Sequence, residues 1–194
     1  MRSNIQNAIA GIWVLCLAAC ASNAVSVQSS GMTGISFSPK RILVVGLMKN
    51  RADVTTDAFA ATLADGFKSC GVVEESIFQE SETPRLSLAK EDRMSLFWKK
   101  MREKKAEYKP DALLEITAIS YTMKSEIFSK VLNSVNYSVR LTEFPSGGVV
   151  WGASLMLKDT STDKGQAELA SQIVGLLKKE GVLHDCSFDS TGAR

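Results

Sequence analysis

PKRILVVGL, residues 39–47, contains an unbroken aliphatic run that indicates the class of the fold. Ile42–Val45 present apolar side chains in both directions, which is typical of a strand that is covered on both faces of a sheet. Gly46 is expected to end this strand. Strands buried on both sides need helices above and below, so the run predicts an α/β arrangement.

A helix is predicted to follow this strand, capped by Asp53, Thr55 or Thr56. Its apolar stripe recurs at i, i+4 and i+8 and consists of Phe59, Leu63 and Phe67. Gly71 stands where a helix end favours a left-handed residue. The stretch GVVEESIFQE, residues 71–80, then predicts a second strand, which completes one β-α-β unit.

Further elements follow towards the C-terminus. A second helix is predicted from apolar residues at i, i+3, i+4 and i+7, a third strand from alternation at 112–119, and an antiparallel hairpin from alternation on either side of FPSGG. The apolar residues of the second helix are Met94, Phe97, Trp98 and Met101. The strands of the hairpin are residues 135–141 and 149–157, and the second strand has Val149, Trp151, Ala153 and Leu155 on one face. The intervening stretch 123–134 is expected to be less ordered. A last helix begins near Thr162 or Asp163 and ends at KKEG, residues 178–181.

The sequence therefore predicts one domain at residues 39–182, followed by a loosely attached tail at 183–194. Its fold class is α/β (α+β): a mixed sheet of about five strands with a C-terminal antiparallel hairpin, packed by three helices.

The N-terminal region has the features of an export signal. Arg2 precedes an apolar run of a dozen residues from Ala8 to Ala19, which is too short for a helix that spans a bilayer at roughly 20 residues. Within it, LAAC at Leu17–Cys20 resembles the lipobox of bacterial lipoproteins. That resemblance implies a signal peptide at residues 1–19 and lipidation of Cys20. The alternative is an ordinary signal peptide cut after ACA at residues 19–21, which would discard Cys20.

Residues 20–38 are predicted to be the lipidated cysteine and a flexible tether. The stretch 21–38 is rich in Ser, Gly and Ala and carries no charge. The residues after Cys20 are Ala21 and Ser22, and the lipoprotein resemblance then implies the outer membrane, facing the periplasm, with the inner membrane as an alternative.

Composition and motifs exclude several functions. The net charge of +2 gives no electrostatic reason to expect a nucleic-acid partner. The chain contains no GxSxG, Walker or HExxH motif and no GxGxxG after a predicted strand. Its single histidine, His184 beside Asp185 and Cys186, lacks the ligand spacing of a zinc site. We therefore expect no enzyme, no catalytic residues, no metal and no cofactor.

Cations crowd the second predicted helix between Lys99 and Lys105. One interpretation is a patch that binds anionic lipid headgroups or an acidic partner. The alternative is a solvated helix face whose C-terminal cations interact favourably with the helix dipole.

The cysteine count suggests a disulfide. If Cys16 leaves with the signal and Cys20 is acylated, Cys70 and Cys186 are the two remaining thiols, and an oxidising compartment allows them to pair. The alternative is two unpaired thiols.

The order strand, helix, strand, helix, strand, hairpin, helix resembles the small α/β domain of several Gram-negative envelope lipoproteins. The group includes the outer-membrane lipoproteins that activate peptidoglycan synthases, the curli secretion lipoprotein, and the N-terminal domain of the Tol-system propeller protein. The residues that carry the likeness are RILVVGL (41–47), KPDALLEITAIS (109–120) and YSVRLTEFPSGGVVWGASLML (137–157).

The resemblance implies a lipid-anchored periplasmic binding or adaptor module. Its expected partners are the membrane, through the anchor, and a protein complex of the cell envelope that serves cell-wall synthesis, transport or secretion. The alternatives are an oligomerising subunit of a secretion pore and a lipoprotein that binds a small ligand.

Overall fold

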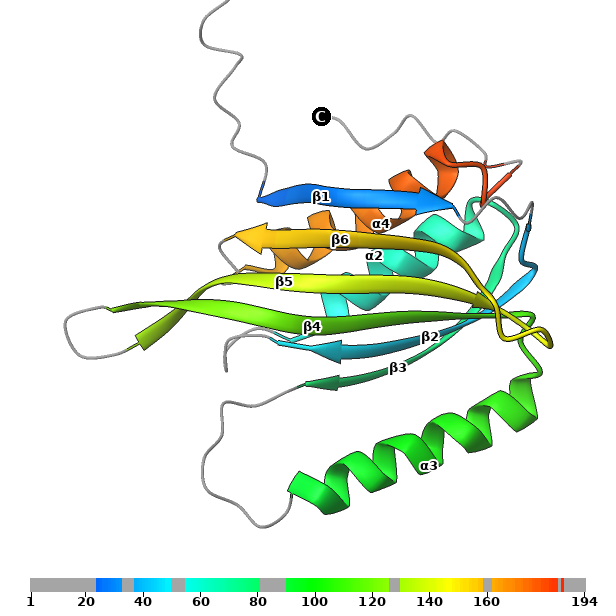
Figure 1. Cartoon of the computed structure of the whole chain (residues 1–194), viewed down its shortest axis with the longest axis horizontal. Coiled ribbons are helices and arrows are strands. Elements are labelled where there is room, and N and C mark those ends of the chain that lie inside the picture. The colour runs from blue at the N-terminus through cyan, green and yellow to red at the C-terminus, as the bar shows by residue number, and fades with distance from the viewer. Residues whose placement is uncertain are drawn as a thin grey trace, which may run out of the picture.

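The computed structural model describes residues 24–32, 37–49, 55–80, 90–125, 130–158, 162–184 and 186. These residues form a mixed sheet with helices on both faces (Figure 1), which confirms the predicted fold class. The sheet has six strands, in the order β1-β6-β5-β4-β2-β3. The elements are β1 (Val25–Met32), β2 (Arg41–Met48), α2 (Asp57–Lys68), β3 (Val73–Glu80), α3 (Lys90–Tyr108), β4 (Ala112–Ser125), β5 (Lys130–Glu143), β6 (Val149–Lys158) and α4 (Asp163–Lys179).

Strand β2 lies between the two strands that follow it in the chain, and it is parallel to both β3 and β4. The chain moves from β2 to β3 in one direction and then returns past β2 to reach β4. Because parallel crossovers keep one hand, connections that run in opposite directions place their helices on opposite faces of the sheet. Helix α2 accordingly packs with α4 on one face, and α3 lies on the other face against β2 and β3 (Figure 1).

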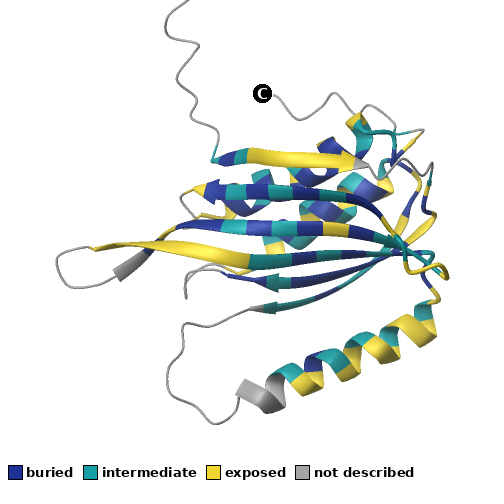
Figure 2. Cartoon of the chain, in the orientation of Figure 1, coloured by how far each residue is buried: buried dark blue, intermediate teal, exposed yellow. Residues whose placement is uncertain are grey.

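The prediction that β2 is buried on both faces is confirmed. Ile42 and Val44 belong to the main core beneath α2 and α4. Leu43 and Val45 belong to a smaller core beneath α3, together with Phe97. The predicted stripe Phe59, Leu63 and Phe67 is fully buried in the main core. Figure 2 shows dark blue, buried segments in the α2 and α4 layer behind the sheet.

Gly46 does not end its strand, contrary to the prediction, because β2 continues to Met48. A Cβ at Gly46 would lie 2.2 Å from Cδ1 of Phe78 on the neighbouring strand β3. The glycine therefore makes room for an aromatic ring rather than for a turn.

Part of the predicted tether is a strand. Residues Val25–Met32, which lie within the 20–38 segment, form β1 and pair antiparallel with β6 along the edge of the sheet. Val25 is buried in the main core, whereas Val27 is 43% exposed. Because β1 buries little apolar surface, it is held in place mainly by backbone hydrogen bonds to the edge strand β6.

The stretch 123–134 also differs from the prediction. Strand β4 extends to Ser125 and β5 begins at Lys130, so both are 14 residues long. In the hairpin that follows, the structure also corrects one face assignment. Trp151, Ala153 and Leu155 are buried as expected, but Val149 is 41% exposed because the pairing of β5 and β6 shifts between Leu141 and Thr142.

Helix α4 begins as predicted. Thr162 is its N-cap, and its hydroxyl accepts a hydrogen bond of 3.1 Å from the Gly165 amide. Within the described parts of the chain, no helix combines the length and apolar character needed to cross a membrane.

Candidate functional site

The predicted lipidation residue, Cys20, lies outside the described residues, as does the whole predicted signal peptide. The first described residue is Ala24, and β1 begins at Val25. Between Cys20 and the sheet the chain therefore has only residues 21–24. Five residue steps span at most about 17 Å. An acyl chain on Cys20 would hold the start of β1 close to the bilayer, in contrast to the long tether that the sequence predicts.

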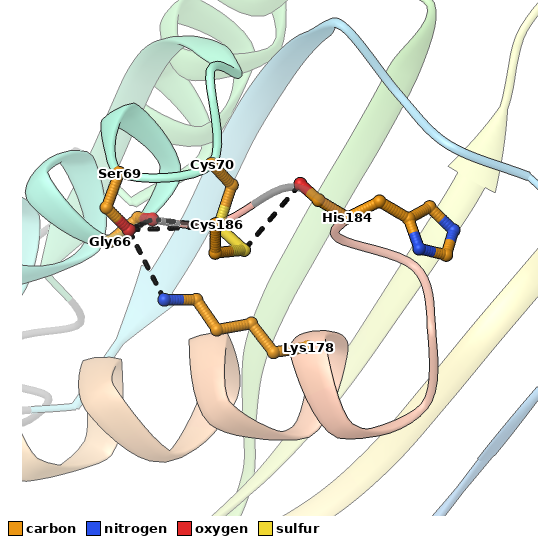
Figure 3. The surroundings of a disulfide bond; sticks show 6 residues. All are labelled: Gly66, Ser69, Cys70, Lys178, His184 and Cys186. Atoms are coloured by element: carbon orange, nitrogen blue, oxygen red, sulfur yellow. Dashed lines mark hydrogen bonds between the residues drawn. A yellow bond between two sulfur atoms is a disulfide. The ribbon is translucent and has the colours of Figure 1, made fainter. Parts of the chain in front are cut away.

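The structure joins the two thiols that the cysteine count singled out. Cys70 follows α2, Cys186 follows α4, and their sulfur atoms are 2.12 Å apart (Figure 3). Cys70 is buried at 8% exposure. Beside the bridge, Lys178 of α4 donates a hydrogen bond of 3.3 Å to the Ser69 hydroxyl, so the two helices are also linked by a polar contact (Figure 3).

The start of the predicted tail is part of the domain. Gly181 has φ +73°, and the amides of Val182 and Leu183 both donate to the Leu177 carbonyl, which closes the end of α4. Val182 is fully buried and Leu183 is 4% exposed. The chain after α4 is therefore held by backbone hydrogen bonds and apolar packing as well as by the disulfide.

His184 is exposed and lies next to Asp185, which is outside the described residues. Cys186, the third member of the HDC stretch, is in the disulfide. Among the residues that the structure describes, no group of three His, Cys, Asp or Glu side chains is placed to hold a metal ion.

One half of a sheet face is covered by none of the described helices and carries polar side chains. Helix α3 covers β2 and β3, and the same face of β4, β5, β6 and β1 lies beside it. Gln28 Nε2 donates to Asn136 Oδ1 at 3.2 Å, and Asn136 Nδ2 donates to the Ser120 hydroxyl at 2.8 Å. The Ser154 hydroxyl donates to Gln28 Oε1 at 3.1 Å. These four residues form a hydrogen-bonded ladder across four strands.

We call this surface the open face and define it by its outward residues: Gln28, Glu115, Thr117, Ser120, Asn136, Ser138, Arg140 and Ser154. The alternation in the sequence predicted that Asn136, Ser138 and Arg140 would lie opposite the core, and the structure confirms it. The contribution of Gln28 could not be predicted, because β1 was assigned to the tether. A face with many donors and acceptors and few apolar groups suits a polar protein surface.

The paired ends of β4 and β5 form a second feature, which we call the β4–β5 arm: residues 119–125 and 130–134. Every residue of β4 from Ile119 to Ser125 is exposed. Three of them are large and apolar, with Ile119 59% exposed, Tyr121 47% exposed and Met123 37% exposed. Figure 2 shows this exposed end of β4 at the left of the sheet.

The cations of α3 do not form one free patch. Lys104 donates to Glu75 at 2.8 Å, and this hydrogen bond, followed by the charges of Glu107 and Glu75, raises the pKa of Lys104. Lys105 Nζ lies 3.7 Å from the centre of the Phe144 ring. Lys99 forms an i,i+4 pair with Glu103 at 3.9 Å. These contacts support the second alternative, a helix face that is largely paired and solvated.

Burial perturbs the pKa values of Tyr137, which lies in the core, and of Glu74, which is half-buried. Burial raises the pKa of Tyr137 to about 12, and its hydroxyl donates to the Lys49 carbonyl at 3.2 Å. Tyr137 therefore stays protonated at physiological pH and acts as a hydrogen-bond donor inside the core. Burial also raises the pKa of Glu74 above its ordinary value of 4.5. Glu74 Oε1 is buried without a hydrogen-bond partner, and a hydrogen bond with Ser76 offsets only part of the effect of burial on the carboxylate.

No protein-family model matches the chain, and no curated protein matches it. Among solved structures, the PelC dodecamer from Paraburkholderia phytofirmans is similar at 13% identity and a TM-score of 0.42, over 82% of this chain and 97% of that one. The lipoprotein GNA1162 from Neisseria meningitidis is similar at 19% identity and a TM-score of 0.40, over 73% and 99% of the two chains. A minor lipoprotein from Acinetobacter baumannii has 13% identity and a TM-score of 0.27, over 72% and 93%. Similarities of this size leave the function to be argued from the chain's own residues.

Proposed function

We propose that this chain is a lipoprotein of the bacterial cell envelope that acts as a binding module fastened to a membrane by Cys20. The observation that carries the proposal is the position of LAAC at the end of a short apolar run, with Cys20 five residues before the folded domain begins at Val25. Two or more acyl chains on one cysteine give stable anchoring, because each buried methylene contributes about 0.8 kcal/mol. We propose the outer membrane, facing the periplasm, as its location.

The open face is the surface that we assign to a protein partner. It offers hydrogen-bonding groups from four strands, and Arg140 lies opposite Glu115 in the register of β5 and β4. Two helices cover the other face and α3 covers the remaining part of this one. The proposal is therefore an adaptor that presents one polar sheet surface to an envelope protein complex, without catalysis and without a cofactor.

The proposal can be tested by site-specific photocrosslinking in living cells. A photoreactive residue at Arg140 or at Ser154 should produce a discrete protein adduct, since both positions lie on the open face. Ser171, which is exposed on α4, is the matched control and should produce none. Equal adducts at all three positions, or none at any of them, would contradict the assignment of the open face.

The secretion-pore alternative makes a different prediction. A pore subunit assembles into a large ring in mild detergent, whereas an adaptor purifies as a monomer or a small complex. Measurement of the mass of the purified, acylated protein by light scattering separates the two, and a large ring would favour the pore.

A further inference from the structure

We propose that the β4–β5 arm docks on the surface of the lipid bilayer that holds Cys20. This inference rests on the proposed anchor and adds a second, non-covalent membrane contact, made by Ile119, Tyr121 and Met123. It follows from three observations: where the anchored chain enters the sheet, in which direction the arm projects, and which side chains the arm exposes.

The entry point of the chain and the arm lie at the same end of the sheet. Val25 pairs with Leu157, Leu157 pairs with Val135, and Val135 pairs with Tyr121. Tyr121 is thus on the same cross-strand line as the first residue of β1, three strand spacings away. Since neighbouring strands are about 4.8 Å apart, this separation is about 14 Å. It is comparable to the reach of about 17 Å that residues 21–24 allow between Val25 and Cys20.

The arm also projects in the direction of the anchor. Strand β1 is antiparallel to β6, β6 to β5, and β5 to β4, so β4 advances in the direction from which the chain enters β1. Residues 122–125 extend past the Tyr121 line by about 13 Å at 3.3 Å per residue. Figure 1 shows the C-terminal end of β4 on the same side as the start of β1. If Cys20 is anchored in a bilayer, the arm therefore projects towards the surface of that bilayer.

The side chains of the arm suit an interface between water and lipid. Tyr121 and Met123 lie opposite Val135 and Leu132, so they share one face of the arm, and Ile119 is the extra residue at a bulge. All three side chains remain substantially exposed, although Lys49 Nζ lies 5.1 Å from the centre of the Tyr121 ring. A tyrosine places its ring in the apolar layer and its hydroxyl in water, and such residues are enriched at headgroup level.

Exposed cations accompany this apolar group. Lys124 is on the arm itself, and Lys158 lies in register with Ser134, one step from the Tyr121 line. Lysines that extend from an apolar group reach the phosphates of anionic lipids. The arm has exposed apolar residues on one face and a lysine beside them in the chain, which fits a membrane surface better than the open face does, because the open face is mostly polar apart from Met156.

The test uses the full chain, processed and acylated in cells, purified and reconstituted into vesicles of phosphatidylethanolamine and phosphatidylglycerol. Tyr121→Trp adds an indole on the arm. Val149→Trp is the matched control, because Val149 is 41% exposed against 47% for Tyr121 and lies at the other end of β6. Val149 is eight residues from Leu157, or about 26 Å along the strand. Emission is compared between vesicles with ordinary lipids and vesicles with dibrominated acyl chains, which quench indoles in contact with them.

We expect the emission that Tyr121→Trp adds over the wild-type protein to fall by roughly half or more, because an interfacial side chain lies at the boundary of the acyl chains. The emission added by Val149→Trp should be unchanged. Equal quenching at both positions, or at neither, would overturn the docking. A blue-shifted but unquenched indole at position 121 would also overturn it, since a protein surface would then cover the arm.

The mass spectrum of the same samples separates this inference from the proposed function. An acylated protein with unquenched indole at 121 would overturn the docking and leave the anchor in place. A protein without acyl chains would overturn both. Met123→Trp repeats the measurement at a second arm position, so the result does not depend on one variant.

Discussion

Removal of the Cys70–Cys186 disulfide should destabilise the domain by several kcal/mol without changing its folded structure. The bridge closes a loop with a sequence separation of 116. In the chain-entropy model, a loop of this size lowers the entropy of the unfolded chain enough to stabilise the fold by about 5 kcal/mol. The native state keeps its contacts without the bridge, because Val182 and Leu183 are held by backbone hydrogen bonds and by burial.

The assay is urea unfolding, followed by circular dichroism, of the wild-type protein and of the Cys70→Ala, Cys186→Ala double variant. With a slope of about 2 kcal/mol per molar urea, a loss of 5 kcal/mol lowers the midpoint by about 2.5 M. Dithiothreitol should lower the wild-type midpoint by a similar amount and leave the double variant unchanged, which controls for effects of the alanines themselves. A midpoint change below about 0.5 M would refute the reasoning, as would alkylation of both thiols in the non-reduced protein.

The remaining predictions concern single residues in the strands and helices. Glu74→Gln should raise the melting temperature at pH 7 and have no effect below pH 4.5. Burial raises the pKa of Glu74, so its ionisation opposes folding as the pH rises. An equal gain in melting temperature at both pH values would contradict this. Gly66→Ala should destabilise, because the new Cβ would lie 2.7 Å from Cγ2 of Val174, and overpacking costs about 1–3 kcal/mol against a helix-propensity gain of at most about 1 kcal/mol. Gly175→Ala should stabilise the fold by up to about 1 kcal/mol, because no atom lies within 4 Å of the new Cβ. Urea midpoints that shift in the same direction for both alanine variants would contradict this pair of predictions. Absorbance titration should show one tyrosine that ionises only near pH 12, and Tyr137→Phe should abolish that step.

The elements that were predicted correctly bury side chains in a pattern that the sequence displays. The run Ile42–Val45 has apolar residues on both faces, and helices cover both. Phe59, Leu63 and Phe67 recur with helical spacing and are fully buried. Where burial and local periodicity coincide, the residue pattern alone is sufficient to place the element.

The elements that were missed are held by pairing instead. In β1, Val25 is buried and residues 26–31 are exposed or partly exposed, so its sequence resembles a linker. Its position depends on the free edge of β6, which is remote in the chain. The second half of β4, residues 119–125, is likewise exposed, and β5 is the described strand that pairs with it. Non-local backbone pairing leaves little trace in local composition.

The candidate sites divide in the same way. The polar residues of β5 on the open face follow from alternation, whereas the ladder through Gln28 requires the position of β1. The thiol pair follows from counting cysteines, and the structure adds that Cys70 and Cys186 each follow a helix of the same layer. The position of the arm relative to Val25 requires the full register across four strands.

The most direct test of the account is the intact mass and N-terminal identity of the mature protein extracted from membranes. The account predicts a first residue of Cys20 whose mass includes a diacylglyceryl group and an amide-linked acyl chain. A mature protein that begins at Ser22, or one that begins at Cys20 without acyl chains, would contradict it.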